Sequence, residues 1–396
     1  MPQRAASPTP THRPDESKRG DDPQPLPRVL FVCGGHRVYG AERKCLAWIQ
    51  GLHERGFPIF CTVNGWNDGE FPRNVQAIGV PFEEIKLGWL YRSKPRWTLD
   101  TLRHLPTAFR AYVRVVRRFQ PDVAIHIGYR SVIQLSWLLG SRNIVAVPDY
   151  WVTSWERRVL PMFDRRVAAY VPPSDDVGRH LASLGLPAEK IHRIYNPVHF
   201  GERRSAPTRS GGGITFGLVG QIVPRKGHHV AIRALAQLCE ARSTRNVILR
   251  VYGNGDAETI AELQQLAADL GVSDLIEWCG YCSNRDEMYG GLDCVLVPST
   301  EPEPFGWVAV EPSCYGIPVI TSDAGGLREI VQDGETGFQV SAGDVESLAE
   351  RMSAICESRQ LAARLATQAF EWNAARFGDE SILNEFAALV RRVAEC

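Results

Sequence analysis

Two glutamates stand eight residues apart in the sequence PSTEPEPFGWVAVEP, which runs from an apolar strand into a helix. Glu303 is predicted to lie in the loop after the strand, and Glu311 inside the helix. Gly306 opens that helix, so backbone N–H groups near Trp307 and Val308 have no partner within it and form an anion site. Carboxylates beside an anion site suit a ligand with both hydroxyls and phosphates, such as a sugar nucleotide. Two solvated acids on a capped helix are the alternative.

A pair of cations occupies a second turn from a strand to a helix. The sequence there is GQIVPRKG, with Arg225 and Lys226 in the turn. Adjacent basic residues on a surface loop are often simply solvated. Here they follow the first strand of a domain. We therefore expect them to face the same cleft as the two glutamates and to stabilise a diphosphate leaving group there.

A glycine-rich turn follows the first strand of the chain, in the sequence GGHRVYGAE. Glycines at such a position allow a ligand to approach the backbone closely. The pattern is not GxGxxG, so its specificity is weak. No DxD triplet is present; its nearest counterpart, Asp68-Gly69-Glu70, is interpreted as a turn, and no metal site is predicted.

Apolar strands alternate with amphipathic helices along most of the chain. The apolar runs are continuous, which indicates parallel strands buried on both faces. The expected strands are Arg28–Cys33, Ile59–Val63, Val123–Ile127, Ile144–Val147, Ile191–Tyr195, Thr215–Val219, Val247–Tyr252, Asp293–Val297 and Pro318–Thr321. The expected helices include Ala41–Arg55, Leu99–Phe119, Gly227–Cys239, Ala257–Leu270, Trp307–Cys314 and stretches after Asp344.

The polar segment Arg203–Gly213 interrupts this alternation and is predicted to link two domains. We therefore predict an α/β fold with two Rossmann-like, doubly wound parallel-sheet domains that face an interdomain cleft. The expected organisation is a disordered tail at 1–27, with seven prolines, and domains at 28–205 and 206–378. A final helix at 379–396 is expected to pack back on the N-terminal domain.

The charge of the 396-residue chain is divided between its two halves. The formal net charge is zero, but residues 1–205 carry 30 Lys+Arg and 19 Asp+Glu, a net of +11, and residues 206–396 carry 15 and 26, a net of −11.

The composition excludes collagen-like and wholly disordered chains, and no apolar run approaches the ~18 residues that span a bilayer. No secretory signal is predicted, and ten scattered cysteines indicate thiols in a reducing compartment, so we expect a cytoplasmic protein.

These features together resemble the retaining glycosyltransferases of family 4 (glycosyl transferases group 1), which have the two-domain GT-B fold. The resemblance covers about residues 28–380 and is most specific at GQIVPRKG, YGNGD, EPEPFGWVAVEP and GIPVITSDAGGLREIV. In that family the C-terminal domain binds the nucleoside diphosphate sugar and the N-terminal domain binds the acceptor. The resemblance implies a retaining, metal-independent hexosyltransferase that needs no cofactor. Its acceptor would be a glycan, lipid-linked or other hydroxyl in polysaccharide or glycoconjugate biosynthesis.

The resemblance also implies roles for individual residues. Glu303 would contact the hydroxyls of the donor sugar, Glu311 the ribose and Lys226 the phosphates, while backbone near Gly280 and Tyr281 would hold the nucleobase. The further residues expected at the donor are Gly40, Gln221, Phe305, Gly306, Trp307 and Val308.

Three positions depart from the family's pattern. Gln221 stands where an Arg is usual, so Arg225 would carry that charge. Tyr39 replaces the first Gly of a paired Gly-Gly, and its larger side chain narrows the approach of this loop to the donor or the acceptor. Pro148 stands where many members have a His, and His126 is the substitute candidate at the acceptor, with a structural role as the alternative.

The acceptor side has a basic and aromatic segment over Lys86–Arg118, from which Arg92 and Trp97 are acceptor candidates. It is either a solvated helix whose aromatics pack inward or a patch that docks on an anionic membrane or holds an anionic acceptor. A non-catalytic sugar-nucleotide or glycan-binding relative is the alternative function. Nucleic acid is not expected as a partner because no recognised binding module is present.

Overall fold

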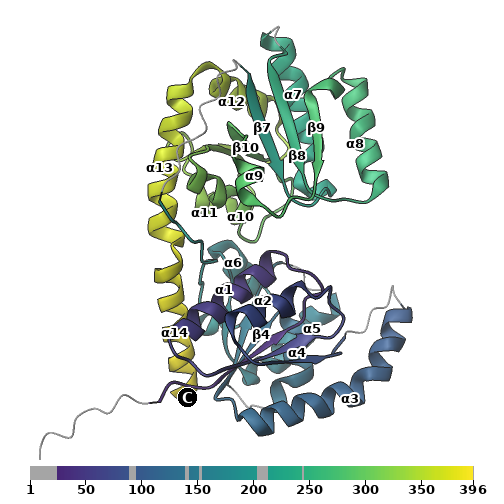
Figure 1. Ribbon diagram of the computed structural model, residues 1–396, viewed down its shortest axis with the longest axis vertical. Helices are drawn as coiled ribbons and strands as arrows, with labels where there is room; N and C mark the ends of the chain where they lie inside the picture. The colour runs from purple at the N-terminus through teal and green to yellow at the C-terminus, as the bar shows by residue number, and fades with distance from the viewer. Residues whose placement is uncertain are drawn as a thin grey trace, which may run out of the picture.

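The protein consists of two lobes, each built on a six-stranded parallel sheet (Figure 1). The computed structural model describes residues 25–88, 95–138, 142–150, 154–202, 213–242 and 245–395. The strand orders are β3-β2-β1-β4-β5-β6 and β12-β11-β10-β7-β8-β9. Both follow the doubly wound Rossmann order, so the predicted fold class is confirmed.

The first lobe carries the glycine-rich turn and the basic segment. Its strands are β1 (Val29–Cys33), β2 (Ile59–Asn64), β3 (Phe82–Ile85), β4 (Val123–Ile127), β5 (Asn143–Ala146) and β6 (Val167–Val171). Its helices are α1 (Gly40–Glu54), α2 (Glu70–Ile78), α3 (Pro95–Phe119), α4 (Tyr129–Leu135), α5 (Ser154–Phe163) and α6 (Asp175–Ser183).

The second lobe carries the paired glutamates and the paired cations. Its strands are β7 (Ile214–Val219), β8 (Val247–Tyr252), β9 (Ile276–Gly280), β10 (Cys294–Val297), β11 (Val319–Ser322) and β12 (Phe338–Val340). Its helices are α7 (His228–Arg242), α8 (Ala257–Asp269), α9 (Arg285–Tyr289), α10 (Trp307–Val310), α11 (Leu327–Ile330), α12 (Val345–Glu357) and α13 (Arg359–Phe377).

The position of a strand within its sheet explains its sequence pattern. The central strand β1 is apolar and buried at every residue because helices cover both of its faces. In the edge strand β9 only Ile276 is buried, and the residues after it alternate between exposed and half-buried. The continuous apolar runs therefore mark the inner strands, whose carboxyl ends point toward the other lobe.

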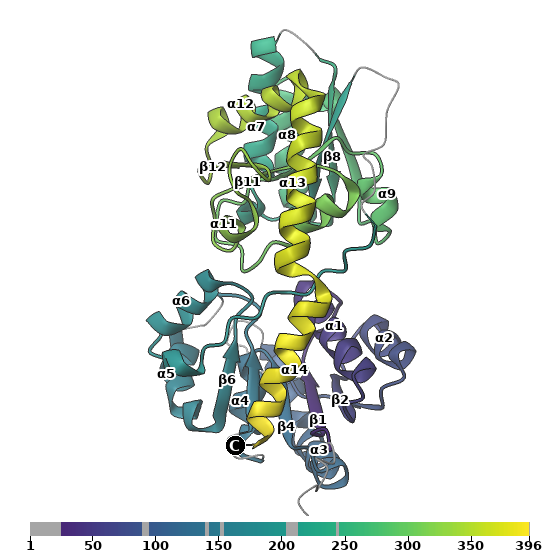
Figure 2. The same cartoon turned by 90° about the vertical axis from the view of Figure 1, so that its left-hand side faces the viewer.

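The end of the chain ties the two lobes together. Helix α13 runs along the second lobe, and α14 (Asp379–Glu395) continues onto the first (Figure 2). There Phe386 stacks on Trp48 of α1 with ring centroids 3.9 Å apart. At the crossing, the backbone N–H of Val198 donates to Phe377 O (2.8 Å), and that of Asp379 donates to Val198 O (3.1 Å). The two segments of the chain that cross between the lobes are thus hydrogen-bonded to one another.

Two predicted elements were wrong in detail. The segment Ile191–Tyr195 is not a strand; Ile191 makes one bridge to Tyr170 of β6, and the apolar residues after it fill the space between the lobes. The helix expected over Trp307–Cys314 ends at Val310 and tightens into a 3₁₀ turn over Glu311–Tyr315, where Pro312 lacks the N–H that an α-helix uses. Strands β3, β6, β9 and β12 are not among the expected strands.

Candidate functional site

The first cluster of the site joins the two turns that the sequence singled out in the second lobe. Lys226 follows β7, and Glu303 follows the neighbouring strand β10. The Lys226 Nζ lies 2.6 Å from Glu303 Oε1, and the Arg225 guanidinium is 3.3 Å from the same oxygen. Ser299 Oγ donates a third hydrogen bond to it at 2.8 Å. The cluster lies where the order of the sheet reverses, the usual binding position in such folds.

The carboxylate of Glu303 is held charged by this cluster. Only 5% of the residue is exposed. Burial by itself raises the pKa of the Glu303 carboxyl, but the charge of Lys226, with its hydrogen bond and that of Ser299, outweighs burial and brings the pKa below its ordinary value. The site therefore presents two cations bridged by one fixed carboxylate.

The second cluster, around Glu311, crosses from one lobe to the other. Glu311 Oε1 accepts a hydrogen bond from Arg43 of α1 in the first lobe and lies 3.3 Å from the Arg285 guanidinium. Its Oε2 accepts a hydrogen bond from Tyr289 Oη at 2.9 Å. Burial raises the pKa of the Glu311 carboxyl, and the charge of Arg285 opposes that rise. Neither Arg43 nor Tyr289 was foreseen from the sequence.

Trp307 forms the contact surface between the two lobes beside this cluster. The Arg43 guanidinium lies 4.7 Å from the centroid of the Trp307 ring. A Cβ added at Gly40 would come within 3.3 Å of the same ring, so the small residue allows the approach. Gly306 precedes Trp307 with φ 105°, a conformation that favours glycine. The expected residues Gly40, Gly306 and Trp307 are therefore brought together.

The remaining predicted donor residues have different surroundings. Phe305 is buried in the core against Tyr195 and Phe377, so its ring packs the fold. Val308 is half-buried and packs against the same core. Gln221 and Tyr281 are exposed at the ends of β7 and β9, where the backbone of Gly280 accepts a hydrogen bond from Gly253 N.

Two further contacts join the lobes. Tyr150 Oη donates to Asp176 at 2.6 Å and lies 3.4 Å from the backbone oxygen of Glu303. The carboxylate of Glu329 accepts hydrogen bonds from the backbone N–H groups of Asp175 and Asp176, each at 3.0 Å. Glu329 thereby caps helix α6 of the other lobe, where a negative charge is favourable.

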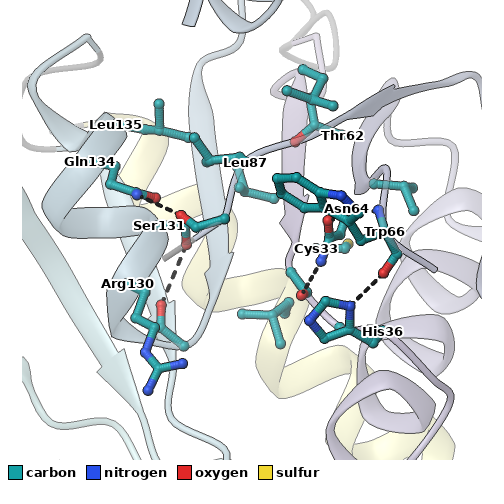
Figure 3. Close-up of a pocket in the computed structure, with 18 of the residues that line it drawn as sticks. Cys33, His36, Thr62, Asn64, Trp66, Leu87, Arg130, Ser131, Gln134 and Leu135 are labelled. Carbon is teal, nitrogen blue, oxygen red and sulfur yellow. Dashed lines mark hydrogen bonds between the residues drawn. The ribbon is translucent and has the colours of Figure 1, made fainter. Parts of the chain in front are cut away.

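A cavity of about 680 Å³ lies in the first lobe, at the carboxyl ends of β1, β2 and β4 (Figure 3). His36 and Trp66 stand on one side and Arg130 and Gln134 on the other. Trp97, an expected acceptor residue, lines this cavity from α3. The sequence indicated no such cavity, because its walls come from six separate segments.

The other two expected acceptor residues are His126 and Arg92. His126 is fully buried within β4 and bonds through its two ring nitrogens to Ser131 Oγ (3.1 Å) and Asn143 Oδ1 (3.0 Å). Burial lowers the pKa of His126 to about 4, which favours the neutral ring and supports the structural alternative for this residue. Arg92 lies outside the described residues.

The loops around the cavity connect it to the Glu303 and Glu311 clusters. The turn after β1 lines the cavity at Gly35 and His36 and reaches Trp307 at Gly40. Asp149 lines the cavity, and the next residue, Tyr150, touches the Glu303 backbone. A ligand held in the cavity would thus lie beside a ligand held by the two clusters. The arrangement suits transfer of a group from an anionic carrier in one lobe to an acceptor in the other.

Among the residues that the structure describes, no three His, Cys, Asp or Glu side chains are grouped so as to hold a metal ion. The nine cysteines among those residues are all free thiols, including Cys279 and Cys282. No helix in the same ranges has the length and apolarity needed to cross a membrane.

Comparisons with known families divide the chain in the same place. Residues 38–201 match the family described as Glycosyltransferase Family 4, and residues 201–372 match the family described as Glycosyl transferases group 1. Together the two matches cover both lobes and include all the residues of the two clusters.

Individual relatives are more distant. A lipopolysaccharide core biosynthesis glycosyltransferase, LpsE, of Rhizobium meliloti is 32% identical over 172 residues, which cover 43% of this chain and 48% of that protein. A D-inositol 3-phosphate glycosyltransferase of Rhodococcus jostii is 27% identical over 344 residues, 76% of this chain and 75% of its own. For the first two curated relatives, the chain spans about half of their length. The structure of Anabaena HepE with UDP and glucose is similar with a TM-score of 0.77 at 21% identity, covering 92% of this chain and 99% of that one.

Proposed function

Because this chain belongs to the glycosyltransferases of group 1 and family 4, we propose that it moves a sugar from a nucleoside diphosphate sugar to an acceptor hydroxyl. The second lobe would hold the donor and the first lobe the acceptor. Solved relatives of this fold carry UDP, UDP with glucose, or UDP-glucose, which supports a nucleotide sugar as the donor.

The observation that carries the proposal is the cation pair at the reversal point of the second sheet. Lys226 and Arg225 both reach Glu303, at 2.6 and 3.3 Å, in a buried setting where charges act strongly. Cations fixed in this way stabilise a departing diphosphate without reorganising during the reaction. Glu303 would in turn accept hydrogen bonds from the sugar hydroxyls, and Glu311 from the ribose.

The proposed reaction retains the configuration of the sugar. The bond between the anomeric carbon and the diphosphate oxygen breaks, and a bond to the acceptor oxygen forms on the same face. The departing phosphate oxygen takes the acceptor's proton. The chain's own residues would supply charge stabilisation and orientation, so the step needs neither a metal ion nor a protein nucleophile.

The acceptor is proposed to reach the cavity of the first lobe, within polysaccharide or glycoconjugate biosynthesis. Helix α3 beside it exposes Leu99, Leu102 and Leu105, of which Leu99 is 70% exposed. Arginines at 110, 114, 117 and 118 are exposed further along the same helix. An apolar tip followed by cations supports a peripheral contact with an anionic membrane.

A turnover assay tests the proposed function. The protein is incubated with a panel of nucleoside diphosphate sugars, and release of the nucleoside diphosphate is measured beside calorimetric binding of the same compounds. Release that is faster than from buffer alone, for at least one donor, supports the transferase. Tight binding with no release for any donor, with or without added acceptors, would instead identify a non-catalytic sugar-nucleotide-binding relative.

A further inference from the structure

The cavity of the first lobe has an apolar interior. Its inner wall is formed by Val32, Ile85, Tyr112 and Leu135, each at most 5% exposed and all members of one apolar cluster. Leu87 lies nearer the rim and packs against the same cluster. A wall of this kind gains free energy by covering apolar surface and offers little to a chain of sugar hydroxyls.

The polar side chains of the wall are already engaged within the protein. Asn64 donates to the Gly34 oxygen and accepts from Trp66 N–H, and Gln134 donates to the Gly88 oxygen (Figure 3). Thr62 donates to a backbone oxygen of β1 at 3.3 Å. An extended glycan would have to break these bonds to replace them with its own.

Tyr112 differs from Asn64, Gln134 and Thr62 in this respect. Its side chain is 1% exposed, and among the residues that the structure describes its hydroxyl has no hydrogen-bond partner. A buried hydroxyl without a partner is costly and calls for an explanation. A ligand with one polar atom at that depth would provide the missing partner.

The rim has the opposite character. His36, Arg96, Asp100 and Arg130 are exposed there, and Trp97 is 51% exposed. The rim also continues into the two loops that touch the second lobe, at Gly40 and at Tyr150. A polar head held at the rim therefore lies on the side of the donor.

We propose that the acceptor has an apolar body, an aromatic ring or an alkyl chain, which enters this cavity while its sugar-accepting hydroxyl stays at the rim. The binding of that body is a property of the cavity; its identity as the acceptor rests on the proposed function. The two sources of apolar body, an aromatic aglycone and a lipid-like chain, share the same chemistry toward the wall.

Three probes with one head group test this proposal by calorimetry: methyl, octyl and 4-nitrophenyl β-glucoside, each below its aggregation concentration. Each methylene that enters an apolar cavity strengthens binding about fourfold. The octyl or the nitrophenyl compound should therefore bind at least about tenfold more tightly than the methyl compound. Preference for octyl identifies a chain and preference for nitrophenyl a ring, and either supports the proposal.

A filled cavity provides the matched variant. Leu87→Trp, or the milder Leu87→Phe, should remove at least about tenfold of the affinity gained from the apolar body. Leu99→Trp, a similar change on the outer face of α3, should leave it unchanged. Equal affinities for all three glucosides, tighter binding of a glucose pentasaccharide, or full affinity in a folded Leu87→Trp protein would overturn the proposal.

Binding of UDP distinguishes a failure of the proposal about the cavity from a failure of the proposed function. Leu87 is not part of the donor clusters, so UDP affinity should be the same in Leu87→Trp and in the unaltered protein. If no protein binds a nucleoside diphosphate, the proposed function fails while the glucoside result still decides the nature of the cavity. If UDP binds and the glucosides do not differ, only the proposal about the cavity fails.

Discussion

Arg43 on α1 and Glu311, 268 residues further along the chain, form an ion pair between the two lobes. The Glu311 side chain is only 6% exposed, so its charge needs partners inside the protein. Arg285 is one of them, and Arg43 contributes the other from the opposite lobe. If Glu311 binds the ribose of the donor, Arg43 occupies that position while the donor is absent.

Replacement of Arg43 should therefore strengthen nucleotide binding. In Arg43→Met, Glu311 keeps Arg285 and Tyr289 but has a free acceptor for the ribose hydroxyls. The dissociation constant for UDP is expected to fall roughly 3- to 10-fold, the equivalent of about 1 kcal/mol. Titration calorimetry measures it, with Arg55→Met as the control, because Arg55 lies just beyond α1 and bonds to Asn384 instead. Weaker binding in Arg43→Met would show that Arg43 itself holds the nucleotide.

Loss of the cation next to Glu303 should affect the reaction more than the fold. Lys226→Met removes the charge that lies 2.6 Å from the carboxylate, and transfer is expected to fall by about 10²–10³. Lys190→Met is the control, since Lys190 forms a comparable 2.7 Å pair with Asp164 in the first lobe. Initial rates at saturating donor and melting temperatures are compared for both variants. Wild-type rates in Lys226→Met would remove this residue from the mechanism.

The sequence was sufficient for the fold and for one half of the site. Local apolar runs in the sequence predict the doubly wound sheets. Lys226 and Glu303 each follow an inner strand, and these two strands lie side by side in the parallel sheet. The contact between Lys226 and Glu303 can be predicted from the order of the strands alone, and the motif pattern implies that order.

The other half of the site depends on contacts that no local pattern encodes. Arg43 and Glu311 meet because contacts between the lobes, among them α14 and the crossing at Val198, hold the two lobes together. Periodicity also placed His126 at a strand end without giving the direction of its side chain, which points into the protein. The apolar cavity is likewise the product of six segments, whose sequences separately indicate only a core.

The buried ring of His126 should make the protein sensitive to acid. Burial lowers its pKa to about 4, below the ordinary value near 6.5, so the folded state favours the neutral ring. The stability that the neutral ring contributes is complete above about pH 6.5 and is lost as the pH falls toward 4. At pH 5 the loss in the free energy of unfolding is roughly 2 kcal/mol. Urea unfolding at pH 7 and pH 5 should show a smaller difference in His126→Gln than in the control His53→Gln, which changes an exposed ring. An unchanged difference in His126→Gln would assign the acid sensitivity to other groups.

The outer face of α3 should bind an anionic membrane. Leu102 is 49% exposed between exposed arginines, so insertion of its side chain removes apolar surface from water while the cations meet the lipid head groups. Co-sedimentation with phosphatidylglycerol vesicles should be strong at low salt, weaker at high salt and absent with phosphatidylcholine. Leu102→Glu is expected to lower the affinity roughly tenfold or more. Leu270→Glu makes the same change at a leucine that is 39% exposed in the second lobe and should have no effect. Equal sedimentation with both lipids, or an equal loss in both variants, would mean that α3 is simply a solvated helix whose charges face water.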